Sequence, residues 1–132
     1  MVARNSVKDA AAPGDIIRGI HVTFAAPAPI EVLASERLDF VYLDGEHGCF
    51  DRRDIETLCI TVERHGLTPS ARIPDPSVAT ITRFLNRGVR GIVVPHVESI
   101  ADAERVIEGA YLDGPRSTPA RSRSSATPAH AA

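Results

Sequence analysis

Four short apolar runs, each followed by a segment with helical spacing, restrict how this chain can fold more than any other feature of its sequence. Continuous apolar runs without polar alternation are typical of strands that are buried on both faces of a parallel sheet. The runs predict strands at residues 16–23, 38–43, 69–73 and 91–94. A strand and a helix repeated four times therefore predict an α/β protein whose parallel sheet is covered by helices.

Two helices are expected between the first three strands, from apolar residues three and four positions apart. One covers residues 29–37, and the clearer one covers residues 51–65, with Asp51 as its N-cap. The expected buried face of the second helix consists of Ile55, Leu58, Cys59 and Val62.

Two further helices follow the third and fourth strands. Asp75 and Pro76 predict the start of the first, as an N-cap followed by proline at the first helical position, and its end is expected near Gly88. The second is expected to begin at Ser99, which together with Asp102 resembles a capping box. The residues expected to be buried are Val78, Ile81 and Leu85 in the first helix, and Ile100, Ala103, Val106, Ile107 and Ala110 in the second.

The length of the chain limits the architecture that these units can form. Right-handed crossovers between parallel strands leave two common solutions, a doubly wound sheet and a closed barrel. A full eight-unit barrel takes about 250 residues, with a lower limit near 200. Because the chain has 132 residues, we expect either a small open sheet or a partial (β/α)8 TIM barrel of about four units.

The two ends of the chain differ in composition from the part between them. Residues 114–132 contain no Val, Ile, Leu, Met or aromatic residue, so this segment cannot bury enough apolar surface to offset the entropy of ordering it. We therefore expect a flexible lead-in at residues 1–13, a folded unit at 14–111, and a disordered low-complexity tail at 112–132.

Composition argues against several classes of protein. No apolar run approaches the roughly 18 residues of a membrane span, and no apolar h-region of a secretory signal opens the chain. The balance of 15 basic and 17 acidic residues gives no support for a nucleic-acid or membrane partner. Two cysteines, Cys49 and Cys59, are too few for a disulfide scaffold, which favours a reducing, cytoplasmic location.

Polar residues that could carry chemistry follow three of the predicted strands. Asp44, Glu46 and His47 follow the second strand, Arg72 ends the third, and His96 follows the fourth. In both architectures, functional groups gather beyond the carboxyl ends of the parallel strands. The sequence therefore predicts that these side chains meet at one edge of the sheet.

His47 and Arg72 are the strongest candidates for functional residues at that edge. Because an imidazole can gain or lose a proton near neutral pH, His47 could move a proton at a carbon next to a carbonyl or in a water. Asp44 and Glu46 could orient it or help to bind a cation. Arg72 could hold a carboxylate or stabilise an oxyanion. The alternatives are a polar turn for the DGEHG segment and a structural ion pair for Arg72.

Other candidate residues have simpler interpretations. His96 is expected to be a surface histidine, and His21 a satisfied residue of the core or of a barrel interior. His65 suits the carboxyl end of a helix. Cys49 has no evident thiolate-stabilising base apart from His47, which argues against a catalytic role.

Four segments resemble the class II 2-oxo-acid aldolases of the HpcH/HpaI family. The run FVYLDGEHG at residues 40–48 looks like the hallmark of that family, and SARIP at 70–74, LNRGVRGIVVP at 85–95 and HVES at 96–99 match it in the same order. The resemblance spans roughly residues 15–111, the amino-terminal half of the family's fold.

The resemblance implies a (β/α)8 barrel that cleaves 4-hydroxy-2-oxo acids to pyruvate, or a related 2-oxo acid, and an aldehyde. It implies a divalent cation (Mg²⁺, Mn²⁺ or Co²⁺) that polarises the 2-oxo group. His47 matches the family's general base and Arg72 its oxyanion-stabilising arginine, while Asp44 and Glu46 fall in the shell around substrate and metal-bound water.

The sequence departs from the family at two points. Asn86 stands where the family has an aspartate that raises the basicity of the catalytic histidine, so a weaker base is expected. The family's metal ligands, a Glu and an Asp after strands five and six, have no counterpart in this chain. The abrupt change of composition after Tyr111 suggests a truncation or frameshift.

Half a barrel is expected to leave apolar strand edges that pair with other chains, so self-association is expected.

The sequence is compatible with three hypotheses about function. The chain could be a metal-dependent aldolase with impaired activity, a non-catalytic remnant or interaction module of that family, or a small open-sheet domain that holds a carboxylate with His47 and Arg72.

Overall fold

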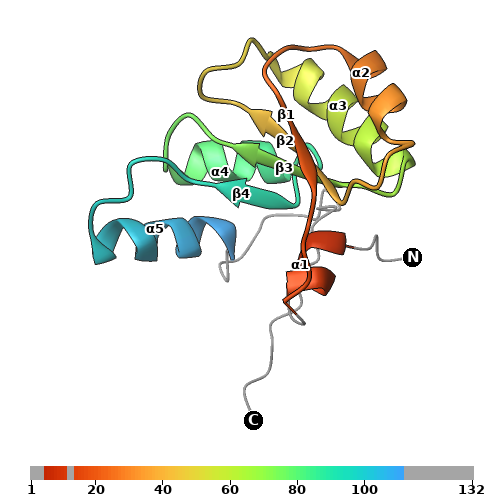
Figure 1. Cartoon of the computed structure of the whole chain (residues 1–132). Helices are drawn as coiled ribbons and strands as arrows, with labels where there is room; N and C mark the ends of the chain where they lie inside the picture. Colours follow the sequence, from red (N-terminus) through yellow and green to blue (C-terminus); the bar gives the residue numbers. More distant parts are fainter. Residues whose placement is uncertain (1–4, 12–13, 112–132) are drawn as a thin grey trace.

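The sheet of this protein is parallel, and its four strands lie side by side in chain order (Figure 1). The computed structural model describes residues 5–11 and 14–111. The strands are β1 (Gly19–Val22), β2 (Phe40–Asp44), β3 (Thr68–Arg72) and β4 (Gly91–Val93), and the helices are α1 (Ser6–Ala11), α2 (Pro27–Leu33), α3 (Arg52–Arg64), α4 (Val78–Leu85) and α5 (Ile100–Ala110). The predicted α/β class is confirmed.

The strand order decides between the two expected architectures. A doubly wound sheet reverses its winding direction, so its strands are not in simple chain order. Here the order is β1-β2-β3-β4, and successive right-handed crossovers then place every connecting helix on the same face of the sheet. This is the winding of a (β/α)8 barrel, of which the structure contains four units.

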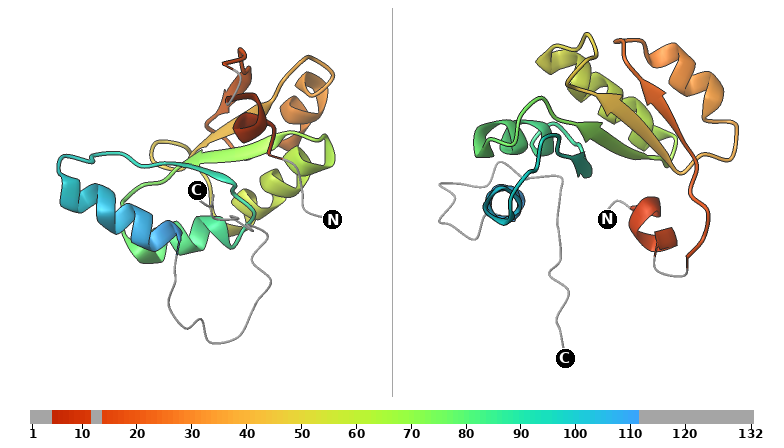
Figure 2. Two further views of the ribbon diagram at one scale, coloured as in Figure 1. Left: turned by 90° about the horizontal axis from the view of Figure 1, so that it is seen from below. Right: turned by 60° about the vertical axis from the view of Figure 1, so that its left-hand side comes forward.

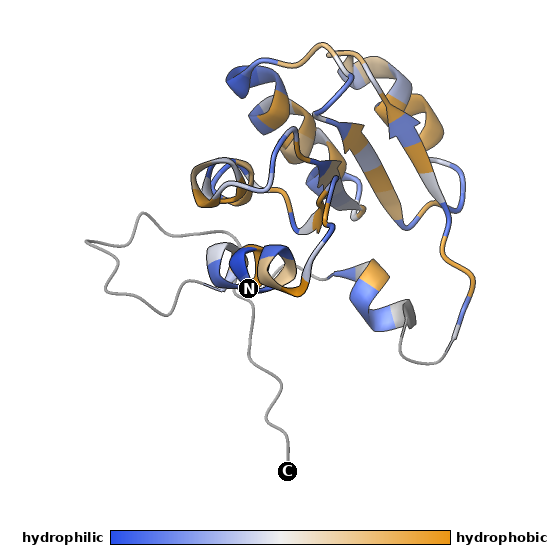
Figure 3. Ribbon diagram, turned by 90° about the vertical axis from the view of Figure 1, so that its left-hand side faces the viewer, coloured by the Kyte–Doolittle hydropathy of each residue, from blue (hydrophilic) through white to orange (hydrophobic). Residues whose placement is uncertain are grey.

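The core lies between one face of the sheet and the helices. Alternate residues of each strand point to that face, and Val41, Leu43 and Ala71 are fully buried on it. The buried helical residues that pack in the same core are Ile30, Ile55, Leu58, Cys59, Val62, Ile81 and Phe84. Figure 3 shows the resulting alternation of hydrophobic and hydrophilic residues along the strands. The predicted buried face of α3 is confirmed.

Helix α3 begins where the sequence predicted. Asp51 accepts hydrogen bonds from the backbone N–H groups of Arg53 and Asp54, and Asp54 in turn accepts one from the backbone of Asp51. This reciprocal pair satisfies amide groups that have no partner within the helix. The start of α3 is therefore set locally, directly after the turn that carries His47.

Helix α4 begins two residues later than predicted. Ser77, not Asp75, is the N-cap, because its hydroxyl accepts from the backbone N–H of Thr80. Asp75 instead binds the backbone of Ser77 and the hydroxyl of Thr80, which tightens the turn before the helix. Val78, predicted to be buried, is 41% exposed at this helix end.

Helix α5 packs against α4 and is the last described element (Figure 2). The contact is made at Gly109, where an added Cβ would collide with Ile81. Ile100 and Ile107 are 81% and 57% exposed, so the prediction that they are buried is wrong. They lie on a face of α5 that the described residues do not cover.

The amino-terminal segment also differs in detail from the prediction. Ile16, predicted to lie in the first strand, is 82% exposed and precedes β1. Residues 6–11, which lie within the predicted lead-in, form the short helix α1. The predicted tail at 112–132 lies outside the described residues.

Candidate active site

The carboxyl ends of β2 and β3 are joined by a two-point ion pair. Asp44 and Arg72 are register partners in the sheet, and Arg72 donates from Nε to Oδ1 of Asp44 at 3.0 Å and from Nη2 to Oδ2 at 2.6 Å. The Asp44 carboxylate is almost fully buried, whereas Arg72 keeps partial contact with solvent. Paired hydrogen bonds of this kind fix the orientation of the guanidinium as well as its position.

Asp44 also shapes the turn that carries the candidate base. Its Oδ1 accepts from the backbone N–H groups of Glu46 and His47, at 3.2 and 3.0 Å. Gly45 lies so close to the backbone of Arg72 that a Cβ would collide with the Arg72 carbonyl, and its N–H donates to that carbonyl at 2.8 Å. Glycine is therefore required for the turn to approach β3.

A histidine from β1 completes the surroundings of Asp44. The Nε2 atom of His21 lies 3.2 Å from Oδ2 of Asp44, and its ring meets Tyr42 edge-on with centroids 5.1 Å apart. The side chain is about half exposed. His21 is thus a partnered residue on the open face of the sheet, and the alternative of a core position is wrong.

The hydrogen bonds from Arg72 hold the pKa of the Asp44 carboxyl well below its usual range. Burial opposes this effect, and the backbone N–H groups of His47 and Glu46 reinforce it. The same pairing raises the pKa of Arg72 above its usual value. Asp44 is therefore a permanent anion at neutral pH, and it is committed to Arg72.

Glu46 connects the remaining charged groups at this edge. Its Oε2 lies 3.2 Å from Nε of Arg72 and 3.8 Å from Nε2 of His47, and its Oε1 lies 3.1 Å from Nε2 of His96. Glu46 is 14% exposed, in contrast to the mostly exposed rings of His47 and His96. One nearly buried carboxylate thus binds Arg72 and His96 and lies beside His47.

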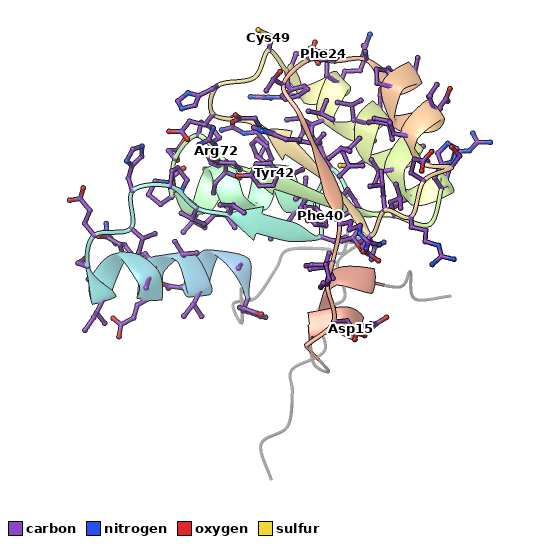
Figure 4. All side chains as sticks on the ribbon, viewed as in Figure 1. Asp15, Phe24, Phe40, Tyr42, Cys49 and Arg72 are labelled. Carbon is purple, nitrogen blue, oxygen red and sulfur yellow. The ribbon has the colours of Figure 1, made fainter. Side chains whose placement is uncertain are left out.

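The structure brings His47 and Arg72 together, as the sequence predicted, because both reach the same oxygen of Glu46. It also shows that Arg72 takes part in a structural ion pair with Asp44, the alternative that the sequence left open for this residue. A functional role for Arg72 stays a prediction. Figure 4 shows Arg72 at the carboxyl edge of the sheet.

Asn86 and Cys49 lie apart from this cluster. Asn86 is the C-cap of α4, and Arg90, four residues later, hydrogen-bonds the backbone of Pro69 at the amino end of β3. Within the described residues, no hydrogen bond joins the Asn86 side chain to His47. Cys49 is an exposed free thiol in the loop after β2, and its backbone N–H binds the carbonyl of Thr23.

Sequence reasoning underestimated His96. It is a surface residue, as predicted, but its ring is hydrogen-bonded to Glu46. The sequence placed His96 at this edge by the same rule as His47, but it gave no signal for the contact with Glu46, which lies 50 positions away.

The described residues do not by themselves fit a divalent cation. They contain no group of three or more His, Cys, Asp or Glu side chains arranged to hold a metal ion. Both carboxylates at this edge already bind Arg72.

In the part of the chain that the structure describes, no helix is long and apolar enough to cross a membrane.

Comparison with known proteins shows what this half-barrel is similar to. No protein-family model matches the sequence. The hydroxypyruvate/pyruvate aldolase of Roseovarius nubinhibens is 32% identical over 103 residues, which are 78% of this chain and 40% of that protein. The chain therefore spans less than half the length of this curated relative.

Two solved structures share the fold over most of the chain. The HpcH/HpaI aldolase from Desulfitobacterium hafniense superposes with a TM-score of 0.80 at 23% identity, over 96% of this chain and 50% of that one. The citrate synthase SbnG gives a TM-score of 0.77 at 31% identity, over 87% of this chain and 48% of that one. The likeness covers about half of each solved chain.

Proposed function

We propose that this chain belongs to the HpcH/HpaI aldolase family, which it resembles over the amino-terminal half of the barrel, and that it carries the histidine–arginine part of an aldolase site. The proposed substrates are 4-hydroxy-2-oxo acids, cleaved to pyruvate or a related 2-oxo acid and an aldehyde. The observation that supports this most is the position of His47 and Arg72 at one oxygen of Glu46.

Each of the two residues has a role in the proposed cleavage. His47, exposed at the edge of the sheet, accepts the proton of the C4 hydroxyl directly or through a water. The C3–C4 bond then breaks, the aldehyde leaves, and the electron pair moves onto the C2 oxygen to form an enolate. A proton returned to C3 completes the 2-oxo acid.

Arg72 stabilises the charge that develops on the C2 oxygen. Its Nε and Nη2 atoms are held by Asp44 and Glu46, and its side chain remains 26% exposed. A guanidinium has five N–H donors, so these bonds leave donors for a ligand. A preorganised donor of this kind costs no reorganisation when the oxyanion forms.

The expected divalent cation (Mg²⁺, Mn²⁺ or Co²⁺) would have to take its ligands from outside the described residues, since Asp44 and Glu46 are engaged by Arg72. We place the protein in the cytoplasm, a proposal that accords with its two free cysteines, Cys49 and Cys59.

The second candidate function is a non-catalytic remnant or interaction module, and the open edges of the sheet favour it. Within the described residues, β1 and β4 each pair with only one strand, and Val93 on β4 is 44% exposed. Unpaired strand edges associate with other chains. This candidate predicts self-association without turnover.

Release of pyruvate from a 4-hydroxy-2-oxo acid, with and without Mn²⁺, tests the two candidates. Aldolase activity should be abolished in His47→Ala and kept in His65→Ala, because His65 caps α3 at the opposite edge of the sheet. If the folded chain shows no turnover and sediments as an oligomer, the non-catalytic candidate is correct.

A further inference from the structure

His96 has an unusual backbone conformation for its residue type. It follows β4, and with φ of +57° it is the one non-glycine residue with positive φ in the described part of the chain. The left-handed region is unfavourable for residues with a Cβ, although histidine enters it more often than most. Such strain persists where the surrounding structure determines it, and it clusters at functional sites.

The left-handed turn accompanies a contact between two strands that are not neighbours in the sheet. Nε2 of His96 lies 3.1 Å from Oε1 of Glu46, although the two residues are 50 positions apart. Glu46 follows β2 and His96 follows β4, while β3, which ends in Arg72, lies between them. The contact therefore crosses over the end of the strand that holds the candidate oxyanion stabiliser.

The two carboxylate oxygens of Glu46 have different partners. Oε1 binds His96, while Oε2 binds Arg72 and lies 3.8 Å from Nε2 of His47. A separation of 3.8 Å is too long for a hydrogen bond. With both oxygens engaged elsewhere, the carboxylate does not capture the His47 ring.

We propose that His96 is a positioning residue that holds Glu46 against Arg72 and so keeps His47 free to exchange protons. If His96 is removed, Oε1 of Glu46 loses this partner, and rotation of the carboxylate brings it into hydrogen-bonding distance of His47. The other charged groups at this edge are already committed, since Asp44 binds both Arg72 and His21. Only the consequence for proton transfer rests on the proposed function; the contact itself does not.

Chemical labelling of the histidines tests this role without any turnover. Diethyl pyrocarbonate acylates a neutral imidazole nitrogen that is accessible and not hydrogen-bonded. The chain has five histidines, and at least one arginine separates each from the next, so each falls in its own tryptic peptide. The rate at His47 can therefore be measured by mass spectrometry in the same digest as the rate at His65, which serves as the reference.

We expect His96→Ala to slow the labelling of His47 about two- to fivefold relative to His65, the range given by an exposed charged hydrogen bond. His96→Asn should do the same, because asparagine tolerates the left-handed backbone but is too short to reach Glu46. His96→Gln, which keeps a donor of similar reach, should restore the wild-type rate. In a Glu46→Ala background, His96→Ala should have no effect on His47.

Three results would overturn the proposal. These are an unchanged rate at His47 in both His96→Ala and His96→Asn, a loss in His96→Gln equal to that in His96→Ala, and the same slowing when Glu46 is absent. Circular dichroism confirms that each variant is folded, and His96→Asn keeps the test open if the alanine variant is not. Because labelling needs no substrate, these results stand whether or not the chain releases pyruvate.

Discussion

Arginine–carboxylate pairs lie near both ends of β3, and they differ in what surrounds them. At the carboxyl end, Arg72 binds Asp44 at 2.6 Å; near the amino end, Arg90 binds Glu63 at 2.8 Å. Arg90 is less exposed than Arg72, at 10% against 26%, whereas Glu63 is more exposed than Asp44, at 21% against 3%. The chemical type and the burial of an ion pair therefore do not distinguish a site from a structural bond.

At the carboxyl end of β3, the carboxylates are shared between several elements. Asp44 and Glu46 both bind Arg72, and they also meet three histidines that come from β1, from the turn after β2 and from the loop after β4. Barrel folds place chemistry at the carboxyl ends of their strands and stability at the amino ends. The proposed site at the carboxyl edge and the Arg90 pair near the amino edge accord with that division.

The backbone shows the same difference between the two edges. Where the chain turns in the left-handed region at the amino edge, it uses glycine, with φ of +74° at Gly66 and +104° at Gly88. At the carboxyl edge it uses His96. The amino edge is built without strain, whereas the carboxyl edge keeps a strained residue whose side chain makes a contact.

The largest expected effect comes from Asp44→Asn. The asparagine oxygen can still accept from the turn, but its amide group faces the donors of Arg72, so we expect a loss of about 2–3 kcal/mol in the free energy of unfolding. Arg72 and the turn carrying His47 should lose their fixed positions. Urea unfolding measures the first effect, and diethyl pyrocarbonate labelling of His47 measures the second.

Glu63→Gln is the matched control at the other end of β3. It weakens the pair between Glu63 and Arg90, so it should destabilise the fold and leave the labelling of His47 unchanged. If Glu63→Gln alters His47 as much as Asp44→Asn does, the two edges are not separate, and the comparison fails.

The position of the polar residues at the carboxyl edge of the sheet could be predicted from the sequence, but the partner of each residue could not. A polar residue directly after an apolar strand was enough to place His47, Arg72 and His96 at one edge. The choice of partner for Arg72 depends on the register that sets Asp44 opposite it, and apolar runs do not encode register to a single residue. The sequence therefore left several roles open for Glu46.

Helix ends show the same limit. The start of α3 at Asp51 was predictable because the reciprocal bonds with Asp54 are local. The start of α4 was misplaced because Asp75 and Ser77 are both good capping residues, and hydrogen bonding to Thr80 decides between them. The exposure of Ile100 and Ile107 could not be predicted from periodicity, which identifies an apolar face but not what covers it.

Low pH should narrow the difference in stability between wild type and Asp44→Asn, because the pKa of Asp44 is lowered in the folded protein. A carboxyl group whose pKa falls on folding stabilises the protein above its unfolded pKa of about 3.9, and this contribution is lost as the pH falls. Wild type should therefore lose stability more steeply than Asp44→Asn below about pH 5, and the gap between the two should still be narrowing at pH 2.

Urea unfolding at a series of pH values measures this narrowing. Asp51, Asp75 and Asp102 also have lowered pKa values, each from hydrogen bonds to its carboxylate. They are present in both proteins, so their contribution cancels in the difference. A gap between wild type and variant that stays constant from neutral pH to acid would show that Asp44 is not paired as an anion.

The smallest expected effects come from substitutions at Gly66 and His96. They separate the cost of a left-handed backbone from the loss of the contact between His96 and Glu46. Gly66→Ala should cost about 1 kcal/mol, because φ is positive and no atom lies within 4 Å to add a steric contribution. At position 96, both Gly and Ala remove the contact with Glu46, but only Ala keeps the strain. His96→Gly should therefore be about 1 kcal/mol more stable than His96→Ala. Thermal unfolding of the four proteins measures both differences, and equal stabilities of the two variants at position 96 would mean that the backbone there is not strained.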